Sequence, residues 1–469
     1  MKNYGAICIL LCVVLMIAAA FPLTAVATDA ADIAATKGCH SPDAQFSLLS
    51  SEEPLVKNVR SAFVYELNSD TLIYALNPDV SEEPASLVKT MTALIAIENG
   101  NLQDAVTIKQ SVLDTIPKGM VSAKLVADEV LTLEDLLYCL MVGSASDAAI
   151  VIADHISGSQ DAFVQLMNTR AAEIGCTGTN FTNTHGLYHS QQVTTARDTA
   201  KILETALENE AFSKIFGSAY YTVPATNKSE ERSLVTNNFL MSKDDTRAYF
   251  DERVTGGRTG VTQDGTRCIA SRAEVDGMRL ICVVMGSASE YRADGKKVRS
   301  FGGFPETSAF LDICFDGYKS VQVIYDGQVL TQCPVSNGNN AVSLGVKTSV
   351  STVLPKDFTA KQLSFQYTNQ SFAAPISAGD PISMVEIWYE NLCVGQAQLY
   401  ALNNVQPAGI LVRDIQDNSL NLWWLLLLIP AIGVIVIIVL YRRRILHVVK
   451  ITIRRIRRRL RRAIKRRRR

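Results

Sequence analysis

The chain has 469 residues, of which 48% are hydrophobic and 20% are charged, and this length exceeds a single typical core, so that two domains are expected. Its 46 basic and 46 acidic residues balance, but 16 of the basic residues lie within 442–469, where no acidic residue occurs. The ten cysteines contain no C-x-x-C pair, which argues against a zinc site.

The N-terminus has the pattern of a cleaved secretory signal. One lysine is followed by an apolar run from Ile7 to Phe21 and by the small residues Ala25-Val26-Ala27. A retained signal anchor is the alternative, which the shortness of the run disfavours. We therefore expect a signal peptide over 1–27 and an N-terminal lead over 28–55. Export permits disulfides, but several of the eight remaining cysteines lie in apolar stretches that suit buried thiols equally well.

Residues 56–317 combine strand and helix patterns. Alternating apolar residues predict strands over 62–66 and 71–76, and again over 269–273 and 279–285, where Asp276-Gly277 marks a hairpin. Helical periodicity between them predicts helices over 132–142, 147–156, 161–174 and 195–207. Strands at both ends with helices between them indicate an α+β fold, in which helices pack on one antiparallel sheet.

A serine and a lysine share the first turn of a further predicted helix. Pro84-Ala85-Ser86-Leu87-Val88-Lys89 opens an apolar-periodic run that ends at Asn99-Gly100. Lys89 would lie one turn after Ser86 and on the same face, within reach of its hydroxyl. A serine hydroxyl needs an adjacent base to become a nucleophile, and a lysine whose pKa is lowered by burial and nearby cations can be that base. An N-capping serine with a surface lysine is the simpler alternative.

Two later segments are candidates for the same site. The small-residue turn Gly143-Ser144-Ala145-Ser146 joins two predicted helices and could point hydroxyls into a cleft. Gly257-Arg258-Thr259-Gly260-Val261 precedes the predicted hairpin, so that it would place a cation and a hydroxyl on an edge strand beside the nucleophile.

The remainder of the chain predicts a β-rich domain and a membrane anchor. Short alternating strands separated by Gly, Asn and Pro turns fill residues 318–412. Residues 422–441 carry no charge and are long enough to cross a bilayer as a helix. Arg442, Arg443 and Arg444 follow directly, which predicts a single-pass protein with its body outside the cell and its tail, 442–469, in the cytoplasm. This placement favours binding of the basic tail to anionic lipid and argues against nucleic acid as its partner.

The three segments around Ser86, Ser144 and Arg258 resemble, in order and spacing, the S-x-x-K, S-x-N and K-T-G set of penicillin-binding proteins and serine β-lactamases. Within that superfamily, Pro84-Ala85-Ser86-Leu87, Thr184-His185-Gly186-Leu187 and Thr195-Ala196-Arg197-Asp198 resemble the D-alanyl-D-alanine carboxypeptidases. The similarity spans residues 55–300. A following β-rich domain and a C-terminal membrane anchor are also usual in that family.

The resemblance implies a role for each matching residue. Ser86 would be the acylated nucleophile and Lys89 its general base, while Ser144 would relay a proton to the leaving D-alanine. Arg258 would bind the terminal carboxylate of the substrate, with Thr259 as a hydrogen-bond donor. The backbone N–H groups of Ser86 and Val261 would form the oxyanion hole. His185 is expected to support its turn, and neither a metal nor another cofactor is implied.

The chain departs from the family pattern at two positions. Arg258 replaces lysine, which preserves the positive charge and suits a carboxylate. Ser146 replaces asparagine, whose longer side chain supplies both a donor and an acceptor. We expect an active serine carboxypeptidase that acts on peptidoglycan stem peptides and is acylated by β-lactam antibiotics. The alternatives are a weak or inactive penicillin- and peptidoglycan-binding protein, suggested by Ser146, and a β-lactamase, disfavoured because no clear deacylating glutamate motif lies between Ser144 and Arg258.

Overall fold

The computed structural model describes residues 41–50, 54–243, 249–292, 298–368, 371–408 and 446–459. The predicted signal peptide and the predicted membrane span over 422–441 both lie outside these ranges. No helix within the described ranges is both apolar enough and long enough to span a bilayer. The chain divides into two compact units, the first comprising Met1–Val321 with Thr352–Ser364 and Ile387–Gly395, and the second comprising Gln322–Ser351, Phe365–Glu386 and Gln396–Arg469.

A five-stranded antiparallel sheet organises the first unit, with strand order β2-β1-β9-β8-β7. Its strands are β1 (Ser61–Glu66), β2 (Thr71–Leu76), β7 (Val254–Val261), β8 (Arg267–Val275) and β9 (Met278–Ser287). Strands from the two ends of this unit therefore meet in one sheet, as the sequence predicted, and the β8–β9 hairpin at Asp276-Gly277 is confirmed. Because β7 has a sheet neighbour on one side only, its other edge is available to the segments that carry the nucleophile.

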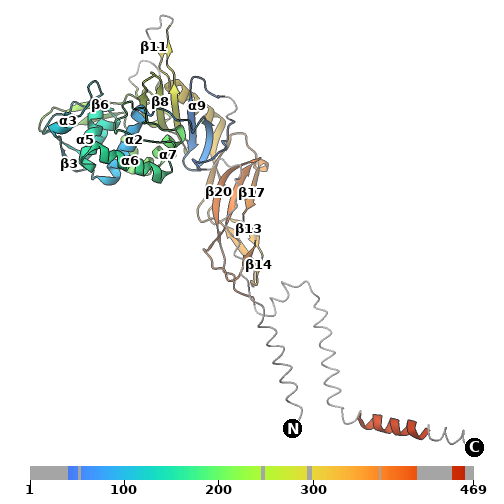
Figure 1. Cartoon of the computed structure of the whole chain (residues 1–469). Helices are drawn as coiled ribbons and strands as arrows, with labels where there is room; N and C mark the ends of the chain where they lie inside the picture. The colour runs from blue at the N-terminus through green and yellow to red at the C-terminus, as the bar shows by residue number, and fades with distance from the viewer. Residues whose placement is uncertain are drawn as a thin grey trace, which may run out of the picture. The chain divides into compact units, whose positions relative to one another are not determined.

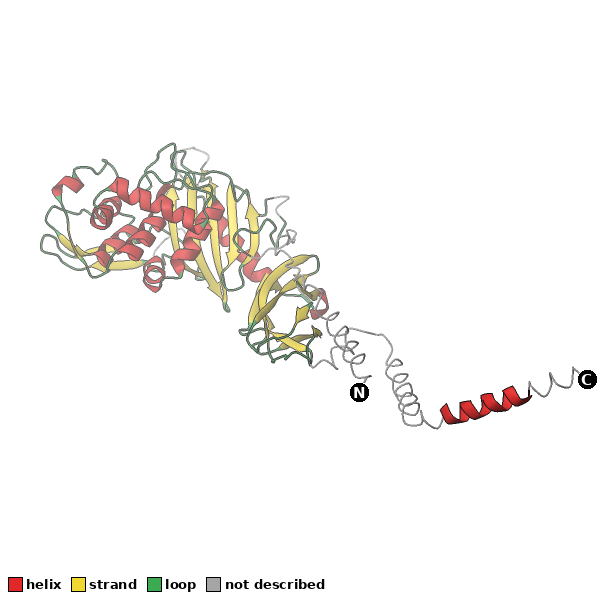
Figure 2. Ribbon diagram, turned by 60° about the horizontal axis from the view of Figure 1, so that its bottom comes forward, coloured by secondary structure: helices red, strands yellow, loops and turns green. Residues whose placement is uncertain are grey.

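Helices cover both faces of this sheet. The described helices of this unit are η1 (Ala85–Leu87), α2 (Val88–Asn99), α3 (Gln110–Leu113), α4 (Leu133–Met141), α5 (Ser146–Ser157), α6 (Gln160–Ile174), α7 (Ala196–Leu207), α8 (Glu210–Phe216) and α9 (Phe304–Gly317). Short strand pairs lie between them: β3 (Ala105–Thr107) with β4 (Val130–Thr132), β5 (Tyr220–Val223) with β6 (Arg232–Val235), and β10 (Glu290–Tyr291) with β11 (Val298–Ser300). Figure 1 shows α2, α5 and α6 gathered together, and Figure 2 shows helices beside the strands of the sheet.

The alternation along β1 explains how the two faces are filled. Ala62 and Val64 pack in a core with Phe310 and Leu311 of α9. Phe63 faces the other way, where the guanidinium of Arg197 on α7 lies 5.3 Å from its ring centroid. Burying each large apolar side chain contributes about 1.5–3 kcal/mol, so the sheet is held rigidly between α7 and α9. This rigid sheet supports β7 and the site beside it.

The predicted helix limits agree with the structure to within one or two residues. Helix α6 ends at Ile174 as predicted, because Gly175 follows it with a φ of +84°, a backbone region that glycine enters without steric cost. At the start of α7, the Thr195 hydroxyl accepts the N–H of Asp198 and caps the helix.

A C-terminal β domain follows the first sheet along the chain, as predicted. Its main sheet has the order β13-β15-β20-β19-β17. The strands and the one short helix after α9 are β12 (Tyr318–Ile324), β13 (Val329–Cys333), β14 (Val335–Ser336), β15 (Val342–Gly345), β16 (Val350–Pro355), η2 (Ala360–Gln362), β17 (Leu363–Tyr367), β18 (Phe372–Ala373), β19 (Pro381–Tyr389) and β20 (Leu392–Ala401). Residues 446–459 form a helix whose apolar side chains, among them Val449, Ile453 and Ile456, are exposed.

Candidate active site

The segment that carries Ser86 is tightly held by its neighbours. Ser86 lies in η1, which leads directly into α2, and its side chain is only partly buried. Ala85 adopts a φ of +45°, an uncommon conformation for a residue with a Cβ atom. Gly186, in the turn at 184–187, lies so close that a Cβ atom on it would sit 2.1 Å from the carbonyl oxygen of Ala85. This turn therefore supports the nucleophile segment and requires glycine at 186.

Lys89 faces Ser86 from the first turn of α2. Its Nζ lies 3.2 Å from Ser86 Oγ and 3.2 Å from Ser146 Oγ, and the residue is 1% exposed. Burial lowers the pKa of Lys89 well below its ordinary value, and the nearby charge of Arg258 lowers it further, against the opposing effect of Asp147. A lysine in this environment can be neutral near pH 7, and a neutral amine beside a hydroxyl is a competent base.

Ser144 and Ser146 lie at the junction of α4 and α5. Ser144 adopts a φ of +57° and is buried, and Ser146 is the first residue of α5. The backbone of this junction is fixed on both sides, because Ala145 N–H donates to Cys139 O and Ser146 N–H donates to Val121 O. The structure thus brings Ser146 Oγ to Lys89, although its side chain is shorter than the asparagine of the family pattern.

Asp147, to which the sequence analysis gave no role, fixes the neighbouring loop. Its carboxylate accepts hydrogen bonds from Ser122 Oγ at 2.7 Å and Ala123 N at 3.0 Å. The same negative charge acts on Lys89 and favours the protonated amine. Its position directly after Ser144-Ala145-Ser146 was the only sequence signal that could have identified it.

Arg258 reaches the site from the edge strand β7. It is 1% exposed, and burial lowers its pKa to about 10. Nη1 donates to Met141 O at 2.8 Å, Nη2 donates to Ser144 Oγ, and Nε donates to Ser86 O at 3.3 Å. The guanidinium therefore links the two serine segments to the sheet, and all three of its nitrogens already donate to protein oxygens. The acceptor at Met141 is a backbone carbonyl, which no side-chain pattern in the sequence could identify.

Thr259 and Val261 continue the same strand. Thr259 is buried, and its hydroxyl donates to Asn237 Oδ1 at 3.2 Å, a partner that the sequence analysis missed. Val261 ends the strand and is 55% exposed. Between them, Gly260 approaches the nucleophile so closely that a Cβ atom on it would lie 2.7 Å from Ser86 N. The strand edge and the start of η1 are therefore adjacent.

His185 is buried within the supporting turn. Its Nδ1 accepts the N–H of Leu187 at 3.1 Å, and burial followed by the charge of Lys89 lowers its pKa to about 4. The ring is therefore neutral near pH 7. These contacts favour the expected structural role.

This arrangement contains what an acyl transfer through serine requires. A partly exposed hydroxyl faces a buried amine, a second serine receives a hydrogen bond from a cation, and a strand edge lies beside the nucleophile's backbone. Within the described part of the chain, no group of three or more His, Cys, Asp or Glu side chains could hold a metal ion.

Comparisons with known proteins agree with this chemistry. Residues 50–289 match the family described as D-alanyl-D-alanine carboxypeptidase, and residues 318–407 match the C-terminal domain of penicillin-binding protein 5. The D-alanyl-D-alanine carboxypeptidase DacA of Haemophilus influenzae is 28% identical over 381 residues, which cover 78% of this chain and 88% of the relative. The corresponding DacC protein of Escherichia coli is 27% identical over 375 residues, covering 77% and 88%. The crystal structure of penicillin-binding protein 5 from Haemophilus influenzae has a TM-score of 0.62 and 26% identity, and the match covers 76% of this chain and 100% of that one.

Proposed function

Because this chain belongs to the D-alanyl-D-alanine carboxypeptidase family of serine peptidases, we propose that it removes the terminal D-alanine from peptidoglycan stem pentapeptides through an acyl-enzyme on Ser86. The observation that carries the proposal is the pair of hydrogen bonds from Lys89 Nζ, at 3.2 Å to Ser86 Oγ and 3.2 Å to Ser146 Oγ. A buried lysine between two hydroxyls has both the low pKa and the position that a general base needs.

In the proposed acylation, neutral Lys89 takes the proton of Ser86, and Oγ attacks the carbonyl carbon between the two D-alanines. The resulting oxyanion accepts hydrogen bonds from the backbone N–H groups of Ser86 and Val261. The C–N bond then breaks as Ser144 passes its hydroxyl proton to the amine of the departing D-alanine, and Ser144 recovers a proton from the Lys89 ammonium, which returns Lys89 to its neutral form. Because Arg258 donates to Ser144 Oγ, the hydroxyl proton of Ser144 is directed away from the cation.

Deacylation requires water in place of the departed amine. Lys89 accepts a proton from the water as its oxygen attacks the ester carbon, and the ester bond to Ser86 Oγ breaks. Ser86 recovers its proton, which regenerates the free enzyme. In this scheme Arg258 and Thr259 attract the substrate's terminal carboxylate, and Arg258 acts through its field because it is only 1% exposed.

The test measures D-alanine released from a pentapeptide ending in D-Ala-D-Ala. We expect release by the wild type and none by Ser86→Ala. A wild type that is acylated by penicillin but releases no D-alanine from several stem peptides would replace this proposal with that of a penicillin-binding protein without carboxypeptidase activity. Rapid hydrolysis of penicillin itself would instead indicate a β-lactamase.

The proposal extends to the termini and the domain limits. A signal peptide over 1–27 would export the chain, the catalytic domain would span 56–317, and the β domain would span 318–412. A span over 422–441 would anchor it in the cell membrane with the basic tail, 442–469, inside. The exposed apolar residues of helix 446–459, interleaved with arginines, support lipid binding by this tail.

A further inference from the structure

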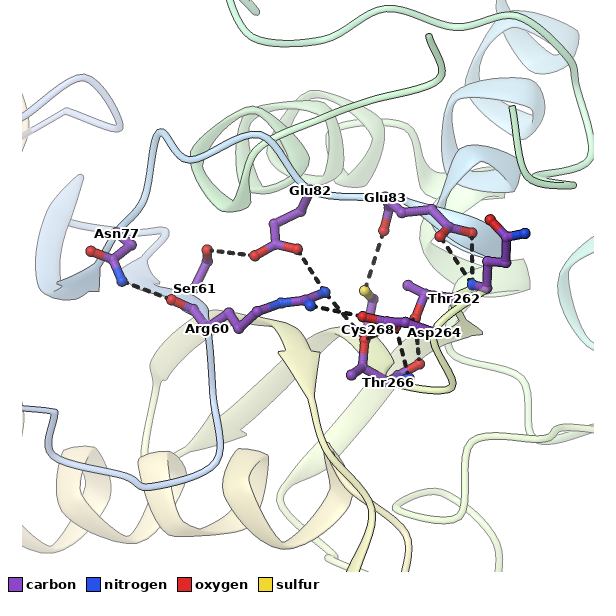
Figure 3. Close-up of polar contacts among 10 residues, drawn as sticks. Arg60, Ser61, Asn77, Glu82, Glu83, Thr262, Asp264, Thr266 and Cys268 are labelled. Atoms are coloured by element: carbon purple, nitrogen blue, oxygen red, sulfur yellow. Dashed lines mark hydrogen bonds and ion pairs between the residues drawn. The ribbon is translucent and has the colours of Figure 1, made fainter. Parts of the chain in front are cut away.

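Two segments that approach the catalytic serine from different parts of the chain are joined by Arg60. One is the nucleophile segment, residues 82–86, and the other is the β7–β8 turn, residues 262–266. Arg60 Nη2 lies 3.0 Å from Glu82 Oε2, and Arg60 Nη1 lies 2.8 Å from Asp264 Oδ2. Figure 3 shows the guanidinium of Arg60 between these two carboxylates. A single cation therefore holds both segments.

Glu83 forms a second link between the same two segments. Its carboxylate oxygens lie 3.2 and 3.0 Å from the backbone nitrogen of Gln263, which donates to them. Its carbonyl oxygen accepts the thiol of Cys268, on β8, at 3.5 Å. Glu83 thus contacts both sides of the β7–β8 hairpin, only three residues before Ser86 (Figure 3).

The backbone geometry of the turn shows which N–H groups face the nucleophile. Successive N–H groups of an extended strand point to opposite edges. Thr262 donates its N–H to Thr266 O, toward β8. The N–H of Val261, the last residue of β7, therefore points to the other edge, and the N–H of Gln263 in the turn donates to Glu83. The Val261 N–H, two residues earlier on that edge, faces the start of η1.

In the proposed oxyanion hole, the backbone N–H groups of Val261 and Ser86 donate to the same oxygen. The distance between these two N–H groups, which is the width of the hole, depends on how the edge of β7 packs against η1. The edge of β7 and the start of η1 lie close together, because a Cβ atom on Gly260 would lie 2.7 Å from Ser86 N. We propose that Glu83 is a positioning residue that sets this width by holding Gln263 N–H, with Arg60 as a second brace through Glu82 and Asp264. This inference rests on the proposed function.

Positioning of this kind affects the transition state and not the initial binding of the ligand. The oxyanion forms only when Ser86 attacks, so a displaced N–H costs acylation rate while leaving noncovalent binding nearly unchanged. We therefore expect Glu83→Ala to lower the penicillin acylation rate constant by about ten-fold and to change the dissociation constant of the preceding complex by less than about two-fold. A peptide boronic acid, which forms a tetrahedral adduct with the serine, should bind Glu83→Ala about ten-fold more weakly.

Three further variants separate positioning from a general loss of structure. Glu83→Gln keeps an oxygen that can accept the Gln263 N–H, and it should recover most of the lost acylation rate. Arg60→Gln removes the other brace and should lower the rate by about three-fold without touching Glu83. Glu274→Ala, an exposed acidic residue on β8 away from this cluster, is the matched control and should acylate like the wild type.

Acylation of Glu83→Ala at the wild-type rate would overturn the proposal, and so would an equal loss of rate and of noncovalent binding. If Glu83→Ala does not fold, Arg60→Gln decides, because a wild-type rate there would equally overturn it. The proposed function fails separately, through the absence of D-alanine release by the wild type. In that case the penicillin acylation rates still test the role of Glu83.

Discussion

Arg258 donates a hydrogen bond from Nη2 to the hydroxyl oxygen of Ser144, which lies 114 residues earlier at the junction of α4 and α5. A cation that donates to a hydroxyl oxygen makes the hydroxyl a better proton donor toward its other partner. The planar guanidinium also reaches Met141 O at 2.8 Å, which a single ammonium could not do in the same direction. Arginine in place of lysine therefore ties Ser144 to the helix that precedes it.

The charge of Arg258 should set the pH at which the enzyme becomes active. Burial and, after it, this charge lower the pKa of Lys89, and a lower pKa makes the neutral base available at a lower pH. Removing the charge with Arg258→Gln raises the pKa of Lys89, so the acidic limb of the acylation rate should move to higher pH. The measurement is the penicillin acylation rate constant across pH.

Arg258→Lys is the control for this shift. This variant keeps the positive charge but loses the planar guanidinium. The acidic limb of the acylation rate should therefore stay near its wild-type pH, while the acylation rate constant falls. An unshifted limb in Arg258→Gln would mean that burial alone controls Lys89.

Penicillin labelling tests the nucleophile and its base. Intact-mass spectrometry should find one penicilloyl adduct on the wild type and none on Ser86→Ala, because the Ser86 hydroxyl beside Lys89 is partly exposed, whereas the Ser146 hydroxyl beside the same lysine is buried. Lys89→Ala should acylate about 10² to 10⁴ times more slowly, since it loses the proton acceptor. An unchanged far-ultraviolet spectrum would show that the fold is retained, and labelling that survives Ser86→Ala would exclude Ser86.

Most of the fold could be predicted because its signals are periodic. Alternation and Asp276-Gly277 identified the β8–β9 hairpin, and 3.6-residue periodicity identified α4, α5, α6 and α7. Helix α9 was missed, although Pro305 at its first turn after Gly303 was a usable start signal. The strand pairing followed from the general rule that strands flanking helices in an α+β unit share one sheet, which the order β2-β1-β9-β8-β7 confirms.

The candidate site was less accessible to sequence reasoning. The resemblance named Ser86, Lys89, Ser144 and Arg258, and the structure places them in contact, whereas their catalytic roles stay predictions. The links through Arg60 and Glu83 were not predicted. Charged residues in connecting segments follow no period, and the partner of Glu83 is a backbone N–H that the sequence cannot mark.

A truncated chain tests the topology. Ending the chain before Leu422 removes the proposed span and the basic tail while keeping every described strand. We expect a secreted, soluble protein that is acylated by penicillin at the wild-type rate, because the site lies wholly within the first unit. Fractionation of the producing cells measures this. Retention of the truncated chain in the membrane fraction would contradict a cleaved signal combined with one C-terminal anchor.

Restoring asparagine at Ser146 tests the largest departure from the family pattern. Ser146 Oγ already lies 3.2 Å from Lys89 Nζ, so the lysine contact survives the change in this chain, and what serine lacks is the longer amide that could also reach the substrate. If that second contact matters, Ser146→Asn should raise D-alanine release by about ten-fold, which corresponds to about 1.4 kcal/mol of transition-state stabilisation.

Ser146→Ala is the matched variant and should lower the rate of D-alanine release, because it removes the hydrogen bond to Lys89. Equal rates for serine and asparagine would mean that Ser146 fills the role already, through a bridging water. Faster release from Ser146→Ala than from the wild type would contradict any part for this hydroxyl in orienting the base.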